Sequence, residues 1–284
     1  MGQIETWISD NKIPIGDWAK NLVDWLLLHV GWLFDFITTI LKVPIEGTVA
    51  LFLVVHPLIF IAITAAIVFV IQRNWWLVFG TVIGMLFILN QGLWDPMIET
   101  LVLILYATLV CLAVGIPIGI AAARRPWIYR SIAPLLDMMQ TIPTFVYLVP
   151  MLFLFGLGAV PGIIATVIFA IPAPIRLTYL GISQVPTALV EAGESFGATR
   201  WQLLNRVKLP AAMPTIMAGV NQCIMLCLSM VVIAGMVGAG GLGNAVVRAL
   251  GQAKMQLGVE AGLAIVIVAI VLDRTLKQRV RKSS

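Results

Sequence analysis

Few residues in this sequence have the types and spacing that catalysis needs. The chain holds two histidines, His29 and His56, and neither lies in an H-E-x-x-H pattern or supports a Ser-His-Asp arrangement. The three cysteines, Cys111, Cys223 and Cys227, lie in apolar segments at spacings that fit neither a metal site nor a disulfide framework. We therefore expect the cysteines to pack in the core and predict no metal or hydrolytic chemistry.

Nucleotide-binding patterns are either missing or out of context. The sequence contains no G-x4-G-K-[ST] phosphate loop, so it offers no usual cradle for ATP phosphates. Residues 238–243 read GAGGLG and formally fit G-x-G-x-x-G, but they follow an apolar run and no strand-turn-helix unit surrounds them. Gly240 and Gly241 are instead candidates for close helix approach at an outer gate, with a passive turn as the alternative.

The sharpest pattern lies between residues 184 and 210. After Glu191-Ala192-Gly193 come three intervening residues and then Gly197, and after nine further intervening residues comes Val207-Lys208-Leu209-Pro210. This spacing predicts a short helix, a turn at Gly197 where a left-handed conformation is allowed, and a second short helix that ends before Pro210. Two such helices would form a compact knob.

The knob resembles the EAA loop of importer-type ABC transporter permeases, whose pattern is E-A-A-x3-G-x9-I-x-L-P. The spacing matches throughout, and the sequence departs only at Gly193, where the pattern has alanine, and at Val207, where it has isoleucine. The likeness to permeases of glycine betaine/proline betaine uptake systems extends over residues 92–274 and is clearest in the runs 136–148, 160–162, 220–222 and 228–234.

This resemblance implies a type I ABC importer permease that alternates between outward and inward access. The implied complex is a homodimer in the bacterial cytoplasmic membrane, with two cytoplasmic ATPases that use ATP and Mg and an extracytoplasmic binding protein that delivers the solute. The chain itself would be neither an enzyme nor a cofactor-binding protein. The implied solute is glycine betaine or a related osmoprotectant, with choline, carnitine, proline or an amino acid as alternatives. The implied ATPase-coupling residues are Glu191, Ala192, Gly193, Gly197, Val207, Leu209 and Pro210.

The composition indicates a membrane protein. Of the 284 residues, 61% are hydrophobic and 11% are charged, and the mean hydropathy is +1.03, whereas soluble domains carry about 25% charged residues. Lipid cannot satisfy open backbone groups, and the apolar runs are too long for barrel strands, so the predicted fold class is all-α. Seven transmembrane helices are expected, at about 48–71, 75–91, 98–123, 134–157, 161–183, 211–237 and 258–273.

The basic residues predict the orientation of these helices. Of the 18 lysines and arginines, only five lie on one side of the predicted membrane, namely Lys12, Lys20, Lys42, Arg248 and Lys254. The richer side is expected to be cytoplasmic, which places the tail of residues 275–284 inside and the N-terminus outside. Because the charge of +5 is spread among apolar runs and forms no basic patch, we exclude nucleic-acid binding.

Residues 1–46 are expected to form an extracytoplasmic segment, followed by a permease domain over residues 47–274. Apolar residues recur there at three- and four-residue steps and predict an amphipathic helix in the outer membrane interface, acting as an anchor or as a docking element. They are Trp18, Leu22, Trp25, Trp32, Leu33, Phe36, Ile37 and Ile40.

Prolines mark the candidate pathway. The fourth and fifth predicted spans are interrupted by Pro143 and Pro150 and by Pro172 and Pro174, which free backbone carbonyls that neighbours or a wet cavity must satisfy. A quaternary ammonium group has no N–H donor and is best stabilised by aromatic faces. Phe145 and Tyr147 are candidates for that role, with ordinary helix packing as the alternative.

Two ionisable residues lie near predicted span ends. Asp137 and Arg176 are expected to reach toward water along their own helices, in preference to a functional role or a pairing across helices. An ion-driven carrier would need an intramembrane ion site and usually inverted repeats, and the sequence shows neither. A membrane enzyme would need a nucleophile with its base, and the spans offer none.

Overall fold

The computed structural model describes residues 14–276, and over that range it contains helices and no strand. The all-α prediction is therefore confirmed. The helices are α2 (Ile15–Val54), α3 (Pro57–Gln72), α4 (Trp75–Asn90), α5 (Trp94–Arg124), α6 (Pro126–Thr141), α7 (Thr144–Phe155), α8 (Ala159–Ala170), α9 (Pro172–Ser183), α10 (Thr187–Ser195), α11 (Arg200–Leu203), η1 (Leu204–Lys208), α12 (Leu209–Ser229), α13 (Val231–Gly235), α14 (Gly241–Gly251) and α15 (Met255–Leu276).

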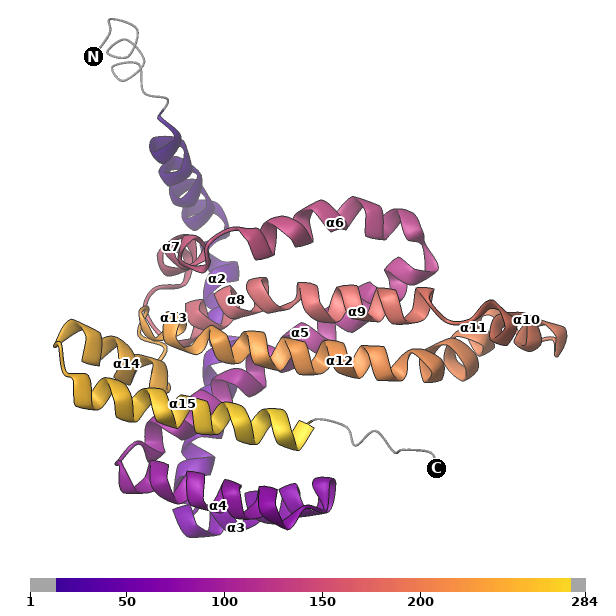
Figure 1. Cartoon of the computed structure of the whole chain (residues 1–284). Coiled ribbons are helices and arrows are strands. Elements are labelled where there is room, and N and C mark those ends of the chain that lie inside the picture. Colours follow the sequence, from indigo (N-terminus) through magenta and orange to yellow (C-terminus); the bar gives the residue numbers. More distant parts are fainter. Residues whose placement is uncertain (1–13, 277–284) are drawn as a thin grey trace, which may run out of the picture.

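The bundle is built around α5, α9 and α12, which run along a common axis beside α15 (Figure 1). Helix α9 fits between α5 and α12 because glycines face it from both sides. A Cβ atom on Gly119 of α5 would lie 2.6 Å from Thr178 Cβ, and one on Gly219 of α12 would lie 2.9 Å from Leu177 Cβ. Small residues at these positions let the helix backbones approach closely.

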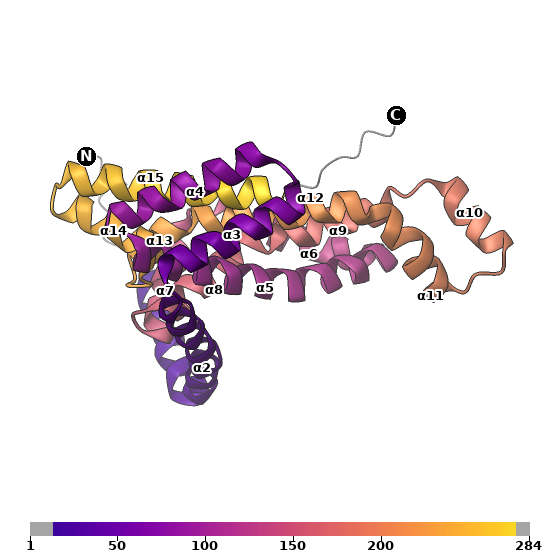
Figure 2. The ribbon, with the colours of Figure 1, turned by 90° about the horizontal axis from the view of Figure 1, so that it is seen from below.

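Helices α10 and α11 project from one end of the bundle, which we call the loop end (Figure 1). The segment 238–241 and helix α14 lie at the opposite end, which we call the far end. Helix α2 runs across the bundle axis near the far end, and Figure 2 shows it almost end-on while α5, α9 and α12 still extend across the view. Its second half packs on the bundle through the buried Ile45, and the Tyr106 hydroxyl of α5 donates to the Pro44 carbonyl at 3.1 Å.

Each of the seven predicted spans contains helices of the structure, but two boundaries differ. The run at 48–71 starts inside α2, which continues to Val54, and α3 begins only at Pro57. The break occurs because Pro57 takes the first helical position, while the His56 ring accepts a hydrogen bond from the Leu58 N–H at 3.3 Å. Helices α3 and α4 have 16 residues each, fewer than the roughly 20 that cross a bilayer without tilt or thinning.

The run at 134–157 is not one straight span. Helices α6 and α7 are bent by 96° at the break between them. Ile142 adopts an extended conformation before Pro143, as the proline ring requires. The Tyr147 hydroxyl then lies 3.1 Å from the Met138 carbonyl and 2.8 Å from that of Met139, so it donates back to the freed end of α6.

Candidate functional site

The predicted turn at Gly197 has a well-defined geometry. Gly197 has a φ of +73°, its N–H donates to the Glu194 carbonyl at 2.8 Å, and the Ala198 N–H donates to the Gly193 carbonyl at 3.1 Å. These two bonds form a Schellman motif, which closes α10 and favours glycine at the left-handed position. Thr199 and Gln202 then form a capping box at the start of α11. The knob is thus a pair of short helices joined by a hydrogen-bonded turn.

The second helix of the knob was predicted to end before Pro210, but in the structure it does not end there. It continues through the π-helical turn η1 into α12, and the Leu209 N–H bonds to the Leu204 carbonyl. A proline ring inside an α-helix collides with the carbonyl four residues earlier. The wider π turn moves that carbonyl aside and lets the helix continue. Helix α11, η1 and α12 therefore form one continuous helical arm, which contains Val207, Leu209 and Pro210.

The surface of the knob exposes large apolar side chains that the sequence pattern did not identify. Phe196 is 92% exposed and Trp201 is 63% exposed, although both lie outside the apolar runs. Glu191 and Ala192 are also exposed on α10. Gly193 instead faces inward, where an added Cβ would lie 2.7 Å from Leu203 Cδ1. The departure to glycine at this position therefore lets α10 lie closer to the second helix.

A basic cavity of about 570 Å³ lies between the end of α5 and the knob. Its lining includes one carboxylate, that of Glu194, among four cationic side chains. These are Arg124, Arg125, Arg200 and Lys208. Excess positive charge thus gathers at the loop end.

At the far end, the start of α5 caps the start of α14. The Gly241 N–H donates to Glu99 Oε2 at 2.5 Å, and the Leu242 N–H donates to Thr100 Oγ1 at 2.8 Å. Both acceptors satisfy backbone groups that a helix N-terminus leaves without partners, and the carboxylate also interacts favourably with the helix dipole. Glu99 was not among the predicted site residues, although an acidic residue inside an apolar run is a usable signal.

Gly240 and Gly241 lie in direct contact with these two side chains. Their φ angles are +82° and +71°, and an added Cβ would lie 2.6 Å from Glu99 Oε2 at Gly240 and 2.5 Å from Thr100 Oγ1 at Gly241. The segment is therefore a tight structural junction that requires glycine. Gly240 also lines a cavity of about 670 Å³ between α2, α5 and α8, together with Glu46, Glu99 and Phe155.

Replacing Gly241 with alanine is expected to destabilise the protein by about 2 kcal/mol or more, since it adds both a left-handed strain and a clash. The midpoint of thermal unfolding of the detergent-solubilised protein measures this. Gly251→Ala, at the other end of α14, is the matched control, because a Cβ there meets nothing within 4 Å. Equal midpoints for the two variants would contradict the assignment of Gly241 as a tight junction.

The candidate pathway residues lie around the break between α6 and α7. Phe145 and Pro143 are exposed, whereas Tyr147 is partly buried and closes the break as described above. The expectation that Asp137 and Arg176 reach toward water separately is wrong. Arg176 Nη2 lies 2.6 Å from Asp137 Oδ1, which joins α9 to α6.

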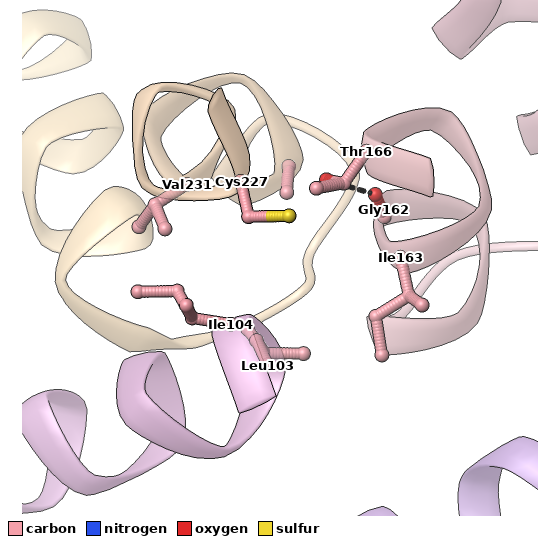
Figure 3. Close-up of a pocket in the computed structure, with 8 residues that line it drawn as sticks. Leu103, Ile104, Gly162, Ile163, Thr166, Cys227 and Val231 are labelled. Carbon is pink, nitrogen blue, oxygen red and sulfur yellow. Dashed lines mark hydrogen bonds between the residues drawn. The ribbon is translucent and has the colours of Figure 1, made fainter. Parts of the chain in front are cut away.

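A small cavity of about 10 Å³ lies between α5, α8, α12 and α13, and Figure 3 shows the residues that line it. The Thr166 hydroxyl donates to the Gly162 carbonyl of its own helix at 2.7 Å, and Cys227 points its sulfur into the space. The remaining lining is aliphatic. A space of this size holds at most one water molecule, so no solute passes through it in this conformation.

The three cysteines lie together although their sequence spacing did not predict it. The Sγ atoms of Cys111, Cys223 and Cys227 all lie within 4.8 Å of one another, and all three residues are buried between α5 and α12. The expected core location is thus confirmed. Cys223 and Cys227 share a face of α12 because they are four residues apart, which is about one helical turn.

These features define a polytopic helical membrane protein with a knob that continues into a central helix. Residues 115–276 match the family model of the binding-protein-dependent transport system inner membrane component. The chain therefore belongs to this family of ABC transporter permeases and is a multi-pass protein of the cytoplasmic membrane.

Individual relatives match almost the whole chain. The glycine betaine transport system permease protein OpuAB of Bacillus subtilis is 48% identical over 274 residues, which cover 96% of this chain and 97% of the relative. The glycine betaine/proline betaine transport system permease protein ProW of Escherichia coli is 46% identical over 272 residues, covering 96% and 76%. A chain of the inward-facing MetNI methionine ABC transporter has a similar fold, with a TM-score of 0.57, 24% identity and coverage of 66% and 92%.

Proposed function

We propose that this chain is the permease subunit of an ATP-driven importer for glycine betaine or a related quaternary ammonium solute. The observation that carries the proposal is the 48% identity to a glycine betaine permease along nearly the full length of both chains. Permease relatives that are aligned end to end share the path through the bundle as well as the coupling loop. The solute of this chain therefore resembles that of its relatives.

The knob is the proposed contact with a partner ATPase, and the two knobs of the homodimer would hold two such ATPases, which bind ATP and Mg in place of this chain. Its exposed aromatic residues, Phe196 and Trp201, suit a groove on another protein. Glu191 and Ala192 lie on the same short helix, while Gly193 and Gly197 set its packing and its end. Because η1 leads directly into α12, movement of the knob would move a helix of the bundle core.

The arrangement of charge supports the proposed orientation, with the loop end in the cytoplasm and the N-terminal segment outside. Four cationic side chains surround the cavity at the loop end, as short cytoplasmic segments commonly do. Helix α2 crosses the bundle axis near the far end and exposes several tryptophans, which suits a helix in the outer interface. A second copy of the chain and an extracytoplasmic binding protein complete the proposed importer.

The gate is proposed at the far end, where Gly240 and Gly241 hold α14 against α5. The residues at the break between α6 and α7, namely Pro143, Phe145 and Tyr147, are the proposed pathway elements. A bent helix pair whose break is closed by one hydroxyl can change shape with little loss of hydrogen bonding.

Uptake measurements test the proposed solute. Vesicles that contain this chain, its ATPase and its binding protein are expected to accumulate labelled glycine betaine only when ATP is present inside. Choline, carnitine and proline serve as competitors, and carnitine is the strongest rival because a relative 47% identical is named for glycine betaine and carnitine. Uptake of another of these solutes would correct the substrate, and uptake driven by an ion gradient without ATP would refute the proposed mechanism.

A further inference from the structure

An ion pair on the outward face of the helical bundle joins α6 to α9. Arg176 Nη2 donates to Asp137 Oδ1 at 2.6 Å. Asp137 lies about three helical turns after the start of α6, and Arg176 lies about two turns before the end of α9. A second contact between these helices is the stack of Tyr129 on Tyr179, whose ring centroids are 3.7 Å apart. Asp137 lies four residues before the break that ends α6, and Arg176 lies seven residues inside the end of the apolar segment Ala159–Ser183, so the pair is within the apolar segments and not at Pro126 or Ser183.

The pair faces outward from the single chain. The Asp137 side chain is 64% exposed and that of Arg176 is 33% exposed. Ionisable groups within such segments lie against protein or water-filled cavities, because contact with hydrocarbon is expensive. This face of α6 and α9 therefore borders a passage or another protein chain, and the proposed import function requires such a passage.

Arg176 uses only part of its hydrogen-bonding capacity. Its Nε atom is buried and has no partner among the described residues, whereas Nη2 is bonded to Asp137. The two nitrogens share one edge of the guanidinium, which can hold both oxygens of a carboxylate in parallel hydrogen bonds. Asp137 occupies that edge with one oxygen on Nη2. A carboxylate that approached the edge squarely would form one more charge-assisted hydrogen bond.

We propose that Asp137 and Arg176 form a waypoint that selects zwitterionic solutes. The carboxylate of the solute replaces Asp137 on Arg176, and the released Asp137 carboxylate faces the quaternary ammonium of the solute. The stack of Tyr129 on Tyr179 holds α6 on α9 while the ion pair is open. This inference rests on the proposed function, because it needs a solute that carries both charges.

Charge balance explains why the waypoint would discriminate. Exchange of one ion pair for two keeps the local net charge at zero, so no charge is left without a partner within the apolar segments. A cation without a carboxylate, such as choline, would leave two positive groups with one carboxylate. The waypoint therefore favours betaine-like solutes over simple cations, even if both reach the permease.

Uptake by ion-pair variants of the complete importer in vesicles tests the proposal, with labelled glycine betaine as the probe. Arg176→Gln is expected to lower uptake about 10-fold or more, because it removes the charge-assisted bonds to the solute. Arg176→Lys should lie between, since an ammonium cannot hold a carboxylate along a planar edge. Asp137→Asn should lower uptake about threefold, less than either Arg176 variant, because it removes the carboxylate that faces the ammonium but keeps the charge-assisted bonds of Arg176 to the solute carboxylate.

A swapped variant, Asp137→Arg with Arg176→Asp, separates recognition from helix tethering. It keeps an ion pair between α6 and α9 but moves the guanidinium to α6, and we expect uptake to stay low. Full recovery in the swapped variant, or an equal loss in Asp137→Asn and Arg176→Gln, would overturn the proposal and leave only a tether.

Two further readouts keep the result interpretable. The amount of assembled complex and its ATP hydrolysis stimulated by the binding protein should stay near normal in each variant. If Arg176→Gln fails to assemble, Arg176→Lys and Asp137→Asn decide the same question. Higher uptake in Asp137→Asn supports recognition by the guanidinium, and higher uptake in Arg176→Lys, which keeps an ion pair, overturns it and leaves a tether. Failure of the unmodified importer to take up glycine betaine would refute the proposed function itself, whatever the variants do.

Discussion

Replacing Gly197 with aspartate is expected to uncouple ATP hydrolysis from uptake while the protein still inserts and folds. A Cβ atom at Gly197 meets nothing within 4 Å in this chain, so the new side chain has room. Its carboxylate would project where the proposed ATPase covers the knob, and a charge buried there without a partner costs several kcal/mol. We expect the solute imported per ATP hydrolysed to fall about 10-fold or more, measured by parallel uptake and ATPase assays in vesicles.

Gly197→Asn is the matched control for this prediction. Asparagine has nearly the shape of aspartate, carries no charge, and tolerates the left-handed conformation that the φ of +73° requires. It should retain most of the coupled uptake. An equal loss in both variants would show that the bare backbone of Gly197 matters, and normal uptake in Gly197→Asp would contradict the coupling role of the knob.

Periodicity and spacing were sufficient where the physics is local. Apolar runs located four of the five described helices that are long and apolar enough to cross a membrane, because lipid forces each backbone group to be satisfied within its own helix. The fifth, α2, was expected only as an interfacial helix. The turn at Gly197 was predictable because a left-handed position that closes a helix favours glycine. Pro210 misled the prediction, since a proline usually ends a helix, and the π turn η1 that accommodates it leaves no recognisable signal in the sequence.

Contacts between distant segments were beyond a single sequence. Asp137 and Arg176 are 39 residues apart, and only the packing of α6 on α9 brings them together. Glu99 caps α14 across a separation of 142 residues. Tyr147, predicted as an aromatic face for a cation, uses its hydroxyl to close the break after α6. In each case the residue type was visible, and its partner depended on tertiary structure.

Phe196→Ala is expected to weaken assembly with the ATPase more than any other single truncation on the knob. Phe196 follows α10 directly and is 92% exposed, so contacts within this chain do little to offset the unfavourable hydration of its apolar ring. Aromatic residues that fill a partner's pocket often contribute 2 kcal/mol or more, and about 2 to 3 kcal/mol corresponds to a 30- to 150-fold weaker complex. Co-purification of the ATPase with the permease, followed by titration of the dissociated subunits, measures the change.

Leu250→Ala provides the control, because Leu250 is an exposed apolar residue, 75% accessible, at the far end of the bundle. Its removal should leave ATPase binding unchanged, while thermal unfolding of both permease variants should stay near that of the unmodified chain, since neither side chain is buried. A Phe196→Ala permease that retains its ATPase as well as Leu250→Ala does would contradict the assignment of Phe196 and move the contact to Trp201 or to the exposed Glu191 and Ala192 of α10. Loss of the ATPase only from Phe196→Ala would place the ring in the interface, next to the turn at Gly197 from which α11, η1 and α12 continue into the bundle.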